Sequence, residues 1–236
     1  MGEMSGNLVT VLCSNYNSMR WVEGYCDSLN AQLLSSFNII VCDANSDDGS
    51  REFIRNYKFR EGIDVVFRDY STRISVYEAW NGALEEANTP YVINVNTDDQ
   101  LFPCALTTML GYAVTRPEID VFYSRCLVTD REDHSSITQL YDWPEYSHDN
   151  MLQQCLCGPF PLAKRESLIA AGKFSTEYSI SGDYEMWLRM SKKGFSFLKV
   201  KEPIGSYFFN PKGVSTDMSK FDEHLKQDTK LRSIYK

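Results

Sequence analysis

The sequence has no long hydrophobic run. Across its 236 residues, no apolar stretch approaches the roughly 20 residues that a membrane-spanning helix needs. The N-terminal residues MGEMSGNL contain neither a basic region nor an apolar segment, so a secretory signal is not expected there. Basic residues are in deficit, and the net charge of −8 argues against nucleic acid as a partner. We expect no transmembrane segment, and leave open further domains or peripheral membrane association.

Clusters of cysteine and histidine with metal-ligand spacing are lacking as well. The seven cysteines are an odd number, and only Cys155 and Cys157 lie close together. Their spacing has no cysteine or histidine partners at zinc-like distances. The histidines are isolated between polar residues, and we predict surface positions for His134, His148 and His224. This cysteine usage is typical of a reducing compartment, and we predict a cytoplasmic location.

Predicted strands and helices alternate regularly through the first 125 residues. Continuous β-branched runs predict strands at 8–14, 37–43, 63–69, 91–96 and 120–128. Between them, apolar residues at helical spacing predict helices at 22–33, 46–57, 75–87 and 103–116. Strands and helices that alternate through short connections predict an α/β fold with a parallel sheet covered on both faces.

The second half is less regular. Residues 126–157 are polar, aromatic and aperiodic, which indicates a mobile or substrate-facing segment. Helical patterns return at 164–172 and 181–194, strands at 195–200 and 204–209, and a charged helix at 216–236. The sequence has no internal repeat, low-complexity tract or linker, so we predict a single domain over 1–236.

Polar side chains follow the predicted strands where each one ends. Ser14, Asn15 and Tyr16 follow the first strand, Asp43 ends the second, and residues 96–99 follow the fourth. In open α/β sheets, ligands bind beyond the carboxyl ends of the strands. We therefore expect the binding site at this edge.

Two adjacent carboxylates, Asp98 and Asp99, follow the fourth strand. One interpretation is that an acid here caps the helix that starts near Pro103. The other is that the pair binds a hard cation such as Mg²⁺ or Mn²⁺, which would remove their mutual repulsion and then bind a diphosphate. The residues alone leave both open.

Four segments in order resemble family 2 glycosyltransferases of GT-A fold. They are VTVLCSNYN, VCDANSDDGSREFI, SVYEAWNGALEEANTPYVINVNTDDQLFP and SGDYEMWLRMSKKGFSF, and the similarity runs from Val9 to about Thr216. The resemblance implies a mostly parallel, Rossmann-like sheet with a smaller, irregular acceptor-side region in the second half. It implies a nucleotide-sugar-binding half at about 1–125 and an acceptor-binding half at about 126–210.

The resemblance also assigns roles on the donor side. It implies that the nucleotide base and ribose bind at Ser14, Asn15 and Tyr16, that the base contacts Asp43, and that Asn81 faces the donor. It implies that Asn96, Asp98 and Asp99 form the metal motif, with Asp99 binding Mn²⁺ or Mg²⁺ and Asp98 facing the metal or ribose. Two positions depart from the family: a second acid is replaced by Ala44, and a frequent lysine by Gly82.

Asp183 matches the acid of the family's general-base motif, whose preceding glutamate is Gly182 here. The resemblance implies that Asp183 takes a proton from an acceptor hydroxyl. From the sequence alone, Asp183 could equally be the N-cap of a helix, and the two roles are compatible because the helix dipole favours an ionised carboxylate.

The implied reaction is inverting transfer of a sugar from a nucleoside-diphosphate sugar, with UDP as the expected nucleotide. The acceptor would be a glycan, a lipid-linked sugar or a protein. Aromatic rings stack on sugars, so Trp143, Tyr146 and Phe160 are candidates for the acceptor side, although such rings are often buried. The family's metal-binding histidine has no counterpart in YFFNPKGVST, and we expect Asn210 or water to take its place.

Two other classes of protein are alternatives to a glycosyltransferase. A sugar-nucleotide pyrophosphorylase would carry a glycine-rich basic loop after the first strand, but CSNYNSMRW has no glycine and only Arg20. A carbohydrate-binding or scaffold module that has lost turnover is the second alternative. The acids at 98, 99 and 183 speak against such a module, whereas Ala44 and Gly82 leave it open.

Overall fold

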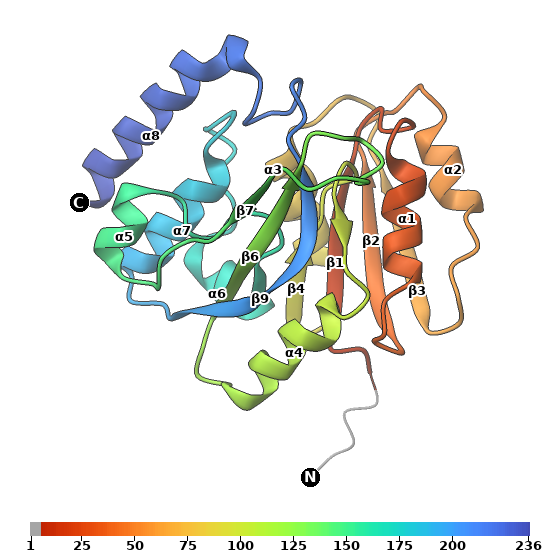
Figure 1. The fold of residues 1–236 in the computed structure, drawn as a ribbon, viewed down its shortest axis with the longest axis horizontal. Coiled ribbons are helices and arrows are strands. Elements are labelled where there is room, and N and C mark those ends of the chain that lie inside the picture. The colour runs from red at the N-terminus through yellow and green to blue at the C-terminus, as the bar shows by residue number, and fades with distance from the viewer. Residues whose placement is uncertain (1–5) are drawn as a thin grey trace.

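The computed structural model describes residues 6–236, so the predicted absence of a signal at the N-terminus falls largely outside the described residues. The strands are β1 Val9–Asn15, β2 Phe37–Asp43, β3 Ile63–Asp69, β4 Tyr91–Asn94, β5 Gln100–Leu101, β6 Val121–Thr129, β7 Gln139–Tyr141, β8 Leu162–Lys164 and β9 Phe197–Phe208. The helices are α1 Val22–Asn30, α2 Ser50–Asn56, α3 Val76–Glu86, α4 Ala105–Thr115, α5 His148–Gln153, α6 Arg165–Ala171, α7 Gly182–Lys192, the short 3-10 helix η1 Met218–Lys220 and α8 Phe221–Tyr235. Figure 1 shows their arrangement.

All nine strands join one sheet, in the order β3-β2-β1-β4-β8-β6-β9-β5, with β7 paired to β6. Strands β3, β2, β1 and β4 are parallel, as predicted, and so are β6 and β9. Strand β6 also runs in the direction of β4, but it does not pair with β4 directly, because the antiparallel β8 lies between them. The α/β class with a mostly parallel sheet is confirmed.

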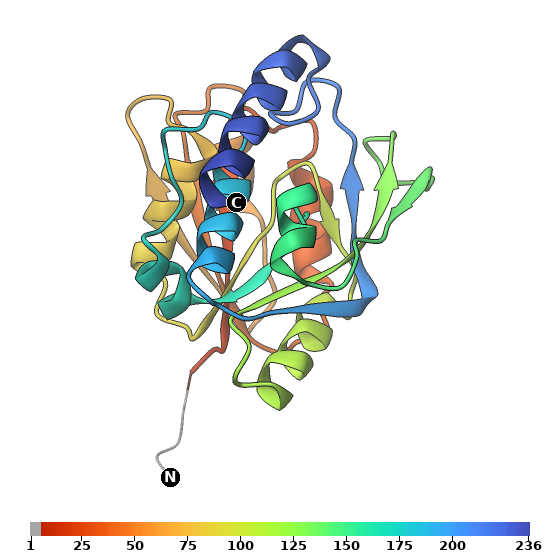
Figure 2. The same cartoon turned by 90° about the vertical axis from the view of Figure 1, so that its left-hand side faces the viewer.

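Two hydrophobic cores cover the two faces of the sheet. Successive strand residues point to opposite faces, so Val11 lies in the core with α1, α2 and α4, and Leu12 lies in the core with α3, α5, α6 and α7. Figure 2 shows α3 and α1 on opposite sides of the strands. Burial on both faces explains why the central strands are apolar throughout.

Several predicted boundaries differ from the structure. Helix α1 ends at Asn30, and Leu33 is 69% exposed rather than buried. The backbone N–H of Leu33 donates to the carbonyl oxygen of Pro103 at 2.7 Å, which takes the chain out of the helix. Helix α3 starts where its pattern predicts, because Ser75 and Glu78 form a capping box.

The two strands predicted at 195–200 and 204–209 form a single strand, β9. Pro203 lies inside it, where the register with β6 shifts around Arg125. An irregularity of this kind accommodates a proline, which cannot donate to the ladder. The short strands β5 and β7 within the irregular segments were not expected, and the C-terminal helix starts at Phe221 rather than at residue 216.

Within residues 6–236, no helix has the length and apolar character needed to cross a membrane. All seven cysteines are free thiols.

Candidate active site

Asp98 and Asp99 lie in the turn between β4 and β5. Asp99 is 1% exposed, and its Oδ1 accepts a hydrogen bond from the backbone N–H of Phe208 at 3.0 Å. Its Oδ2 is buried without a hydrogen-bond partner in the described chain. The Oδ2 atom of Asp98 accepts from Asn210 Nδ2 at 3.0 Å. Neither acid caps α4, whose N-cap residue is Cys104, so the capping interpretation is wrong.

Burial sets the charge state of this pair. Loss of solvent raises the pKa of Asp98, and it raises the pKa of Asp99 well above the ordinary value, with the Asp98 charge adding to the effect. Among residues 6–236, no group of three histidine, cysteine or acidic side chains is gathered as a metal cluster. Two carboxylates suit Mg²⁺ or Mn²⁺, which keep waters and substrate phosphates as their other ligands, and the unpartnered Asp99 oxygen fits that role.

The side-chain amide of Asn210, expected as a metal ligand if water does not take that place, forms hydrogen bonds within the protein at both ends. Its Oδ1 accepts from the backbone N–H of Lys212 at 3.0 Å, and its Nδ2 is bound to Asp98. Asn210 therefore holds Asp98 in place.

His134 lies half-buried beneath Asp98, so its predicted surface position is wrong. Its Nε2 is 3.1 Å from the Asp98 carbonyl oxygen, an acceptor, so Nε2 carries the proton. Nδ1 then accepts from the hydroxyl of Ser206. Burial lowers the pKa of His134, which favours this neutral form. No sequence pattern marked this residue, because it lies in an aperiodic loop.

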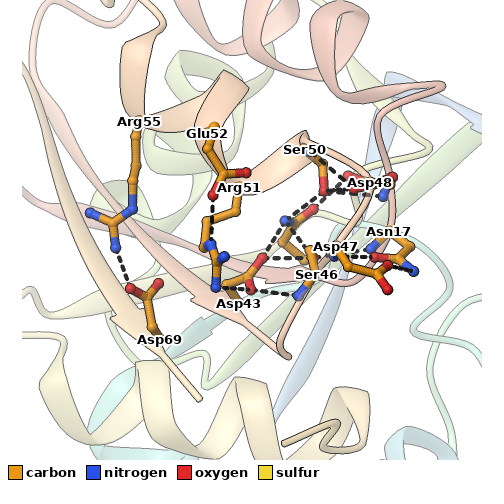
Figure 3. A network of polar contacts seen from close by, with 12 residues as sticks. Asn17, Asp43, Ser46, Asp47, Asp48, Ser50, Arg51, Glu52, Arg55 and Asp69 are labelled. Atoms are coloured by element: carbon orange, nitrogen blue, oxygen red, sulfur yellow. Dashed lines mark hydrogen bonds and ion pairs between the residues drawn. The ribbon is translucent and has the colours of Figure 1, made fainter. Parts of the chain in front are cut away.

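The ends of β1 and β2 form a buried polar network, drawn in Figure 3. Asp43 is fully buried, and its Oδ2 accepts from Asn15 Nδ2 at 2.6 Å and from the Ser46 hydroxyl at 2.7 Å. Its Oδ1 accepts from the Ser46 backbone N–H at 2.9 Å, with Arg51 at 3.8 Å. Asn15 and Asp43 thus lie together at the expected edge of the sheet, where they bind each other and order the turn that follows β2.

Tyr16 and Asn96 remain available at the same edge. Tyr16 is 39% exposed, and the Arg73 guanidinium lies 4.4 Å from the centre of its ring. Ser14 is half-buried at the end of β1, and Asn96 lines the cavity described below. An exposed ring beneath a cation is a suitable surface for a base or a phosphate-bearing ligand.

Asn81 does not join this group. Its amide Nδ2 donates to the Phe174 carbonyl at 2.8 Å, and its Oδ1 accepts from the Phe174 N–H at 2.9 Å. Both ends of the amide are therefore used to tie α3 to the segment before α7, which corrects the expectation that it faces the donor. A Cβ at Gly82 would lie 2.3 Å from Tyr70 Oη, so the family's lysine would require the Tyr70 side chain to move.

A cavity of about 360 Å³ contains Asp99 and Asp183 in its wall. It lies between the β4–β5 turn, the β7 hairpin, the loop 155–161, α7 and α8, and its lining also includes Asn94, Asn96, Tyr141, Trp143, Phe160 and Tyr207. The two acids come from different halves of the chain. The fold therefore brings both carboxylates to the wall of a single cavity.

Asp183 lies in the first turn of α7 and is not the N-cap, which is Ser181. Its Oδ1 is 3.3 Å from the hydroxyl of Tyr77 on α3. Burial raises the pKa of Asp183, while the amides of Tyr184 and of Asp183 itself act in the opposite direction. A buried carboxylate at a helix N-terminus, with a raised pKa, suits proton transfer.

The three predicted acceptor-side rings separate into two groups. Trp143 and Phe160 line the cavity, although Phe160 is only 2% exposed. Tyr146 lies elsewhere: its ring stacks on Phe197 at 4.6 Å and its hydroxyl is 2.9 Å from the Ser191 hydroxyl. Tyr146 therefore packs α5 against β9 and α7 instead of facing the cavity.

Two cavity residues come from the C-terminal helix and were missed. His224 and Asp228 line the cavity, and His224 Nε2 lies 3.7 Å from Asp228 Oδ1. Their spacing of four residues, followed by the buried Leu231, would have indicated an inward helix face. His148 is also half-buried. Its Nδ1 lies 2.7 Å from the Ser191 hydroxyl, and its Nε2 lies 3.0 Å from the Tyr235 carbonyl oxygen.

Gly182 is required by close packing. A Cβ there would lie 2.8 Å from the Ser175 carbonyl oxygen and 2.7 Å from a ring carbon of Tyr77. We expect Gly182→Ala to destabilise the protein by roughly 1–3 kcal/mol through overpacking. Gly111→Ala on α4, with nothing within 4 Å, is the control and should be neutral or stabilising. Thermal unfolding of both variants tests this, and equal melting temperatures would contradict it.

The raised pKa of Asp183 predicts a pH-dependent effect on stability. A carboxyl whose pKa is raised in the folded state stabilises the protein below its unfolded pKa near 3.8, and this contribution is lost as the pH rises through the folded pKa. We therefore expect the melting temperature of Asp183→Asn to increase relative to that of wild type as the pH rises from below 3.8 to neutrality. Each kcal/mol recovered should correspond to roughly 2–4 °C. A difference that does not change with pH would contradict the prediction.

Comparison with known proteins identifies the family of this chain. Residues 10–168 match the family model described as Glycosyl transferase family 2, which is more than half of the chain. The fold and the family define a glycosyltransferase. The chain belongs to glycosyl transferase family 2.

One curated relative matches over most of both proteins. It is the Escherichia coli UDP-Glc:alpha-D-GlcNAc-diphosphoundecaprenol beta-1,3-glucosyltransferase WfaP, 24% identical over 229 residues, which cover 96% of this chain and 86% of WfaP. Several longer polymer synthases also match, and the chain spans between 14% and 27% of their length.

Two solved structures share the fold. Staphylococcus aureus TarS 1–349 in complex with UDP superposes with a TM-score of 0.76 at 16% identity, over 97% of this chain and 65% of that one. The Pyrobaculum calidifontis mannosyltransferase PcManGT, in complex with GDP-Man and Mn²⁺, gives a TM-score of 0.75 at 17% identity, over 98% and 66%. The chain thus spans just under two thirds of these solved chains, and both likenesses confirm the GT-A type of fold.

Proposed function

We propose that this protein transfers a sugar, with inversion, from a nucleoside-diphosphate sugar to a hydroxyl of a carbohydrate acceptor. The observation that carries the proposal is the shared cavity, whose wall contains Asp99 from the first half of the chain and Asp183 from the second. The first acid belongs to a pair suited to a divalent cation, and the second is suited to accept a proton. Aromatic side chains, among them Trp143, supply surfaces on which a sugar ring stacks.

In the proposed reaction, the ionised Asp183 accepts the proton of an acceptor hydroxyl. The hydroxyl oxygen forms a bond to the anomeric carbon, and the bond from that carbon to the diphosphate oxygen breaks. The nucleoside diphosphate leaves with the electron pair, and a single displacement inverts the anomeric configuration. A general base of this kind contributes about 10²–10⁴-fold to the rate.

Asp98 and Asp99 are the residues proposed to hold Mn²⁺ or Mg²⁺. When bound, the cation supplies positive charge that stabilises the diphosphate as negative charge grows on it. Asn210 and His134 keep Asp98 in position through its carboxylate and its carbonyl oxygen. The Mn²⁺ bound to PcManGT, a protein of the same fold, supports this assignment.

For the donor nucleotide we propose UDP, held where β1 and β2 end. The Tyr16 ring is the exposed surface at this edge, with Ser14 beside it, while Asn15 and Asp43 shape the turn from within. TarS in complex with UDP and the UDP-Glc-dependent WfaP support this nucleotide, whereas the GDP-Man complex of PcManGT shows that the fold also accepts guanosine.

The acceptor is proposed to bind the second half of the chain, at about 126–210, with residues 1–125 as the donor half of a single domain. Trp143 and Phe160 are its candidate contacts. A carbohydrate chain or a lipid-linked sugar is the favoured class, because WfaP is named for a diphosphoundecaprenol-linked acceptor. A protein acceptor is the alternative, and we also propose a cytoplasmic location with peripheral membrane attachment.

Release of nucleoside diphosphate tests the proposal. A panel of UDP- and GDP-sugars is incubated with Mn²⁺, the protein and carbohydrate acceptors, and nucleoside diphosphate is quantified. We expect one donor to turn over, with NMR of the product giving an inverted linkage. If no donor turns over while the protein binds glycans with unchanged affinity after Asp183→Asn, a carbohydrate-binding module is the better conclusion.

A further inference from the structure

Helix α8 is bonded to the segment that leads into Asp183. The Gln227 side-chain oxygen accepts from the backbone N–H groups of Ile180 and Ser181, each at 3.1 Å. Its amide nitrogen donates to the Ser179 hydroxyl at 2.7 Å. One glutamine side chain thus binds three consecutive residues of a loop, and the last of them lies two positions before Asp183. Figure 1 shows α8 running beside α7.

Asp228, one residue further along α8, binds the N-cap residue of α7. Its Oδ1 accepts from the Ser181 hydroxyl at 2.7 Å. A serine at an N-cap normally accepts a hydrogen bond from the amides of the first turn, but Ser181 makes no such cap bond. The Ser181 side chain therefore does not bind the first-turn amides, and the amides of Tyr184 and Asp183 lower the pKa of the Asp183 carboxyl against the effect of burial.

The same loop is held from the opposite side by Tyr77 on α3. The Tyr77 hydroxyl donates to the Ile180 carbonyl oxygen and lies 3.3 Å from Asp183 Oδ1. The loop is thus fixed between α3 and α8. The packing of Gly182 on the Tyr77 ring removes further freedom.

We propose that α8 contributes to the active site. Its residues Asp228 and Gln227 are positioning residues that determine the position and hydrogen bonding of Asp183. This inference rests on the proposed function of Asp183 as the base. Helix α8 and α7 both lie beyond the matched residues 10–168, so the family match assigns no role to either. A base displaced by about 1 Å can lose about 100-fold in rate.

Asp228→Ala tests the proposal against Asp222→Ala, which removes an exposed acid of the same helix. We expect Asp228→Ala to lower kcat about 10–100-fold, with the donor KM changed less than about 2-fold, because only the base is displaced. Asp222→Ala should retain wild-type kcat. Equal kcat in the two variants, or a loss confined to KM, would overturn the proposal.

The pH profile separates positioning from general destabilisation. Without Asp228, the Ser181 hydroxyl can return to cap α7 and compete for the first-turn amides, so the acid limb of kcat should move to higher pH. The titratable groups around Asp183 are Tyr77, Cys155, Cys157, His224 and Asp228. The double variant Ser181→Ala/Asp228→Ala lacks this hydroxyl, so the acid limb of its kcat profile should return toward the wild-type pH. An unshifted limb in Asp228→Ala would overturn the route through Ser181.

Hydrogen exchange distinguishes failure of this inference from failure of the proposed function. Gln227→Ala should accelerate exchange of the Ile180 and Ser181 amides, which lose their acceptor, whether or not a donor turns over. Unchanged exchange would overturn the positioning role directly. An inactive wild type with accelerated exchange in the variant would overturn the proposed function and leave the role of α8 in holding the loop intact.

Discussion

Replacing Asp183 with asparagine should lower kcat by about 10²–10⁴-fold, the usual contribution of a general base. The amide has nearly the same shape as the carboxylate but cannot accept the proton of the acceptor hydroxyl. Donor affinity should stay within about 2-fold, because the donor diphosphate is proposed to bind at the β4–β5 turn. Steady-state release of nucleoside diphosphate gives kcat, and calorimetric titration with the donor gives the affinity.

The control is Asp222→Asn, which makes the same chemical change on the exposed side of α8. It should retain full activity. The acid limb of the wild-type profile should also lie above the ordinary aspartate range near 3.8, because burial raises the pKa of Asp183 and the base must be ionised to act. An Asp183→Asn variant with more than about a tenth of wild-type kcat would contradict the assignment.

Much of the fold follows from local pattern. The parallel strands β1, β2 and β3 end within one or two residues of their expected limits, because β1 and β2 are buried runs and none of the three has a competing helical period. What could not be predicted depends on long-range pairing. The two-residue strand β5 exists because it pairs with β9, and the antiparallel β8 exists because it fits between β4 and β6. Neither pairing leaves a signal in so short a segment.

The candidate site shows the same division. The places of Asp99 after a strand and of Asp183 at a helix start could be read from the sequence, whereas their roles came from the family resemblance and stay predictions. Side-chain bonding was not predictable, so Asn81 and Asn210 turned out to bind backbone groups and Asp98 instead of ligands. Position along the chain identifies the edge of the sheet where a residue lies. The remaining hydrogen-bond partners then decide whether its polar atoms are free for a ligand.

The structure gives physical reasons for two departures from the family pattern, the glycines at positions 182 and 82. At Gly182 a side chain would meet the Ser175 carbonyl, and at Gly82 it would meet Tyr70 Oη. Both glycines are thus consequences of packing around α3. Arg68 lies beside Gly82, with its Nη1 donating to the Gly82 carbonyl oxygen at 3.1 Å, so positive charge is present there despite the missing lysine.

The second large effect is expected at Asp99, whose environment favours binding of a cation. Its Oδ2 has no partner, and burial together with the Asp98 charge raises its pKa well above the ordinary value. Metal binding requires an ionised ligand and releases protons. Mn²⁺ affinity should therefore fall as the pH is lowered through the pKa values of the pair. Raising the pH should restore binding until both acids are ionised.

Asp99→Asn should remove the Mn²⁺ dependence of donor binding and lower turnover at least about 100-fold, since a metal ion contributes several kcal/mol to stabilising the leaving group. Donor titrations with and without Mn²⁺ measure the dependence, and metal titration monitored by electron paramagnetic resonance measures binding without reference to activity. Asp130→Asn, at an exposed acid after β6, is the control and should bind Mn²⁺ and donor as wild type does. The metal assignment fails if Asp99→Asn binds Mn²⁺ with wild-type affinity, because Asp98 alone cannot supply both carboxylates that the proposed site requires.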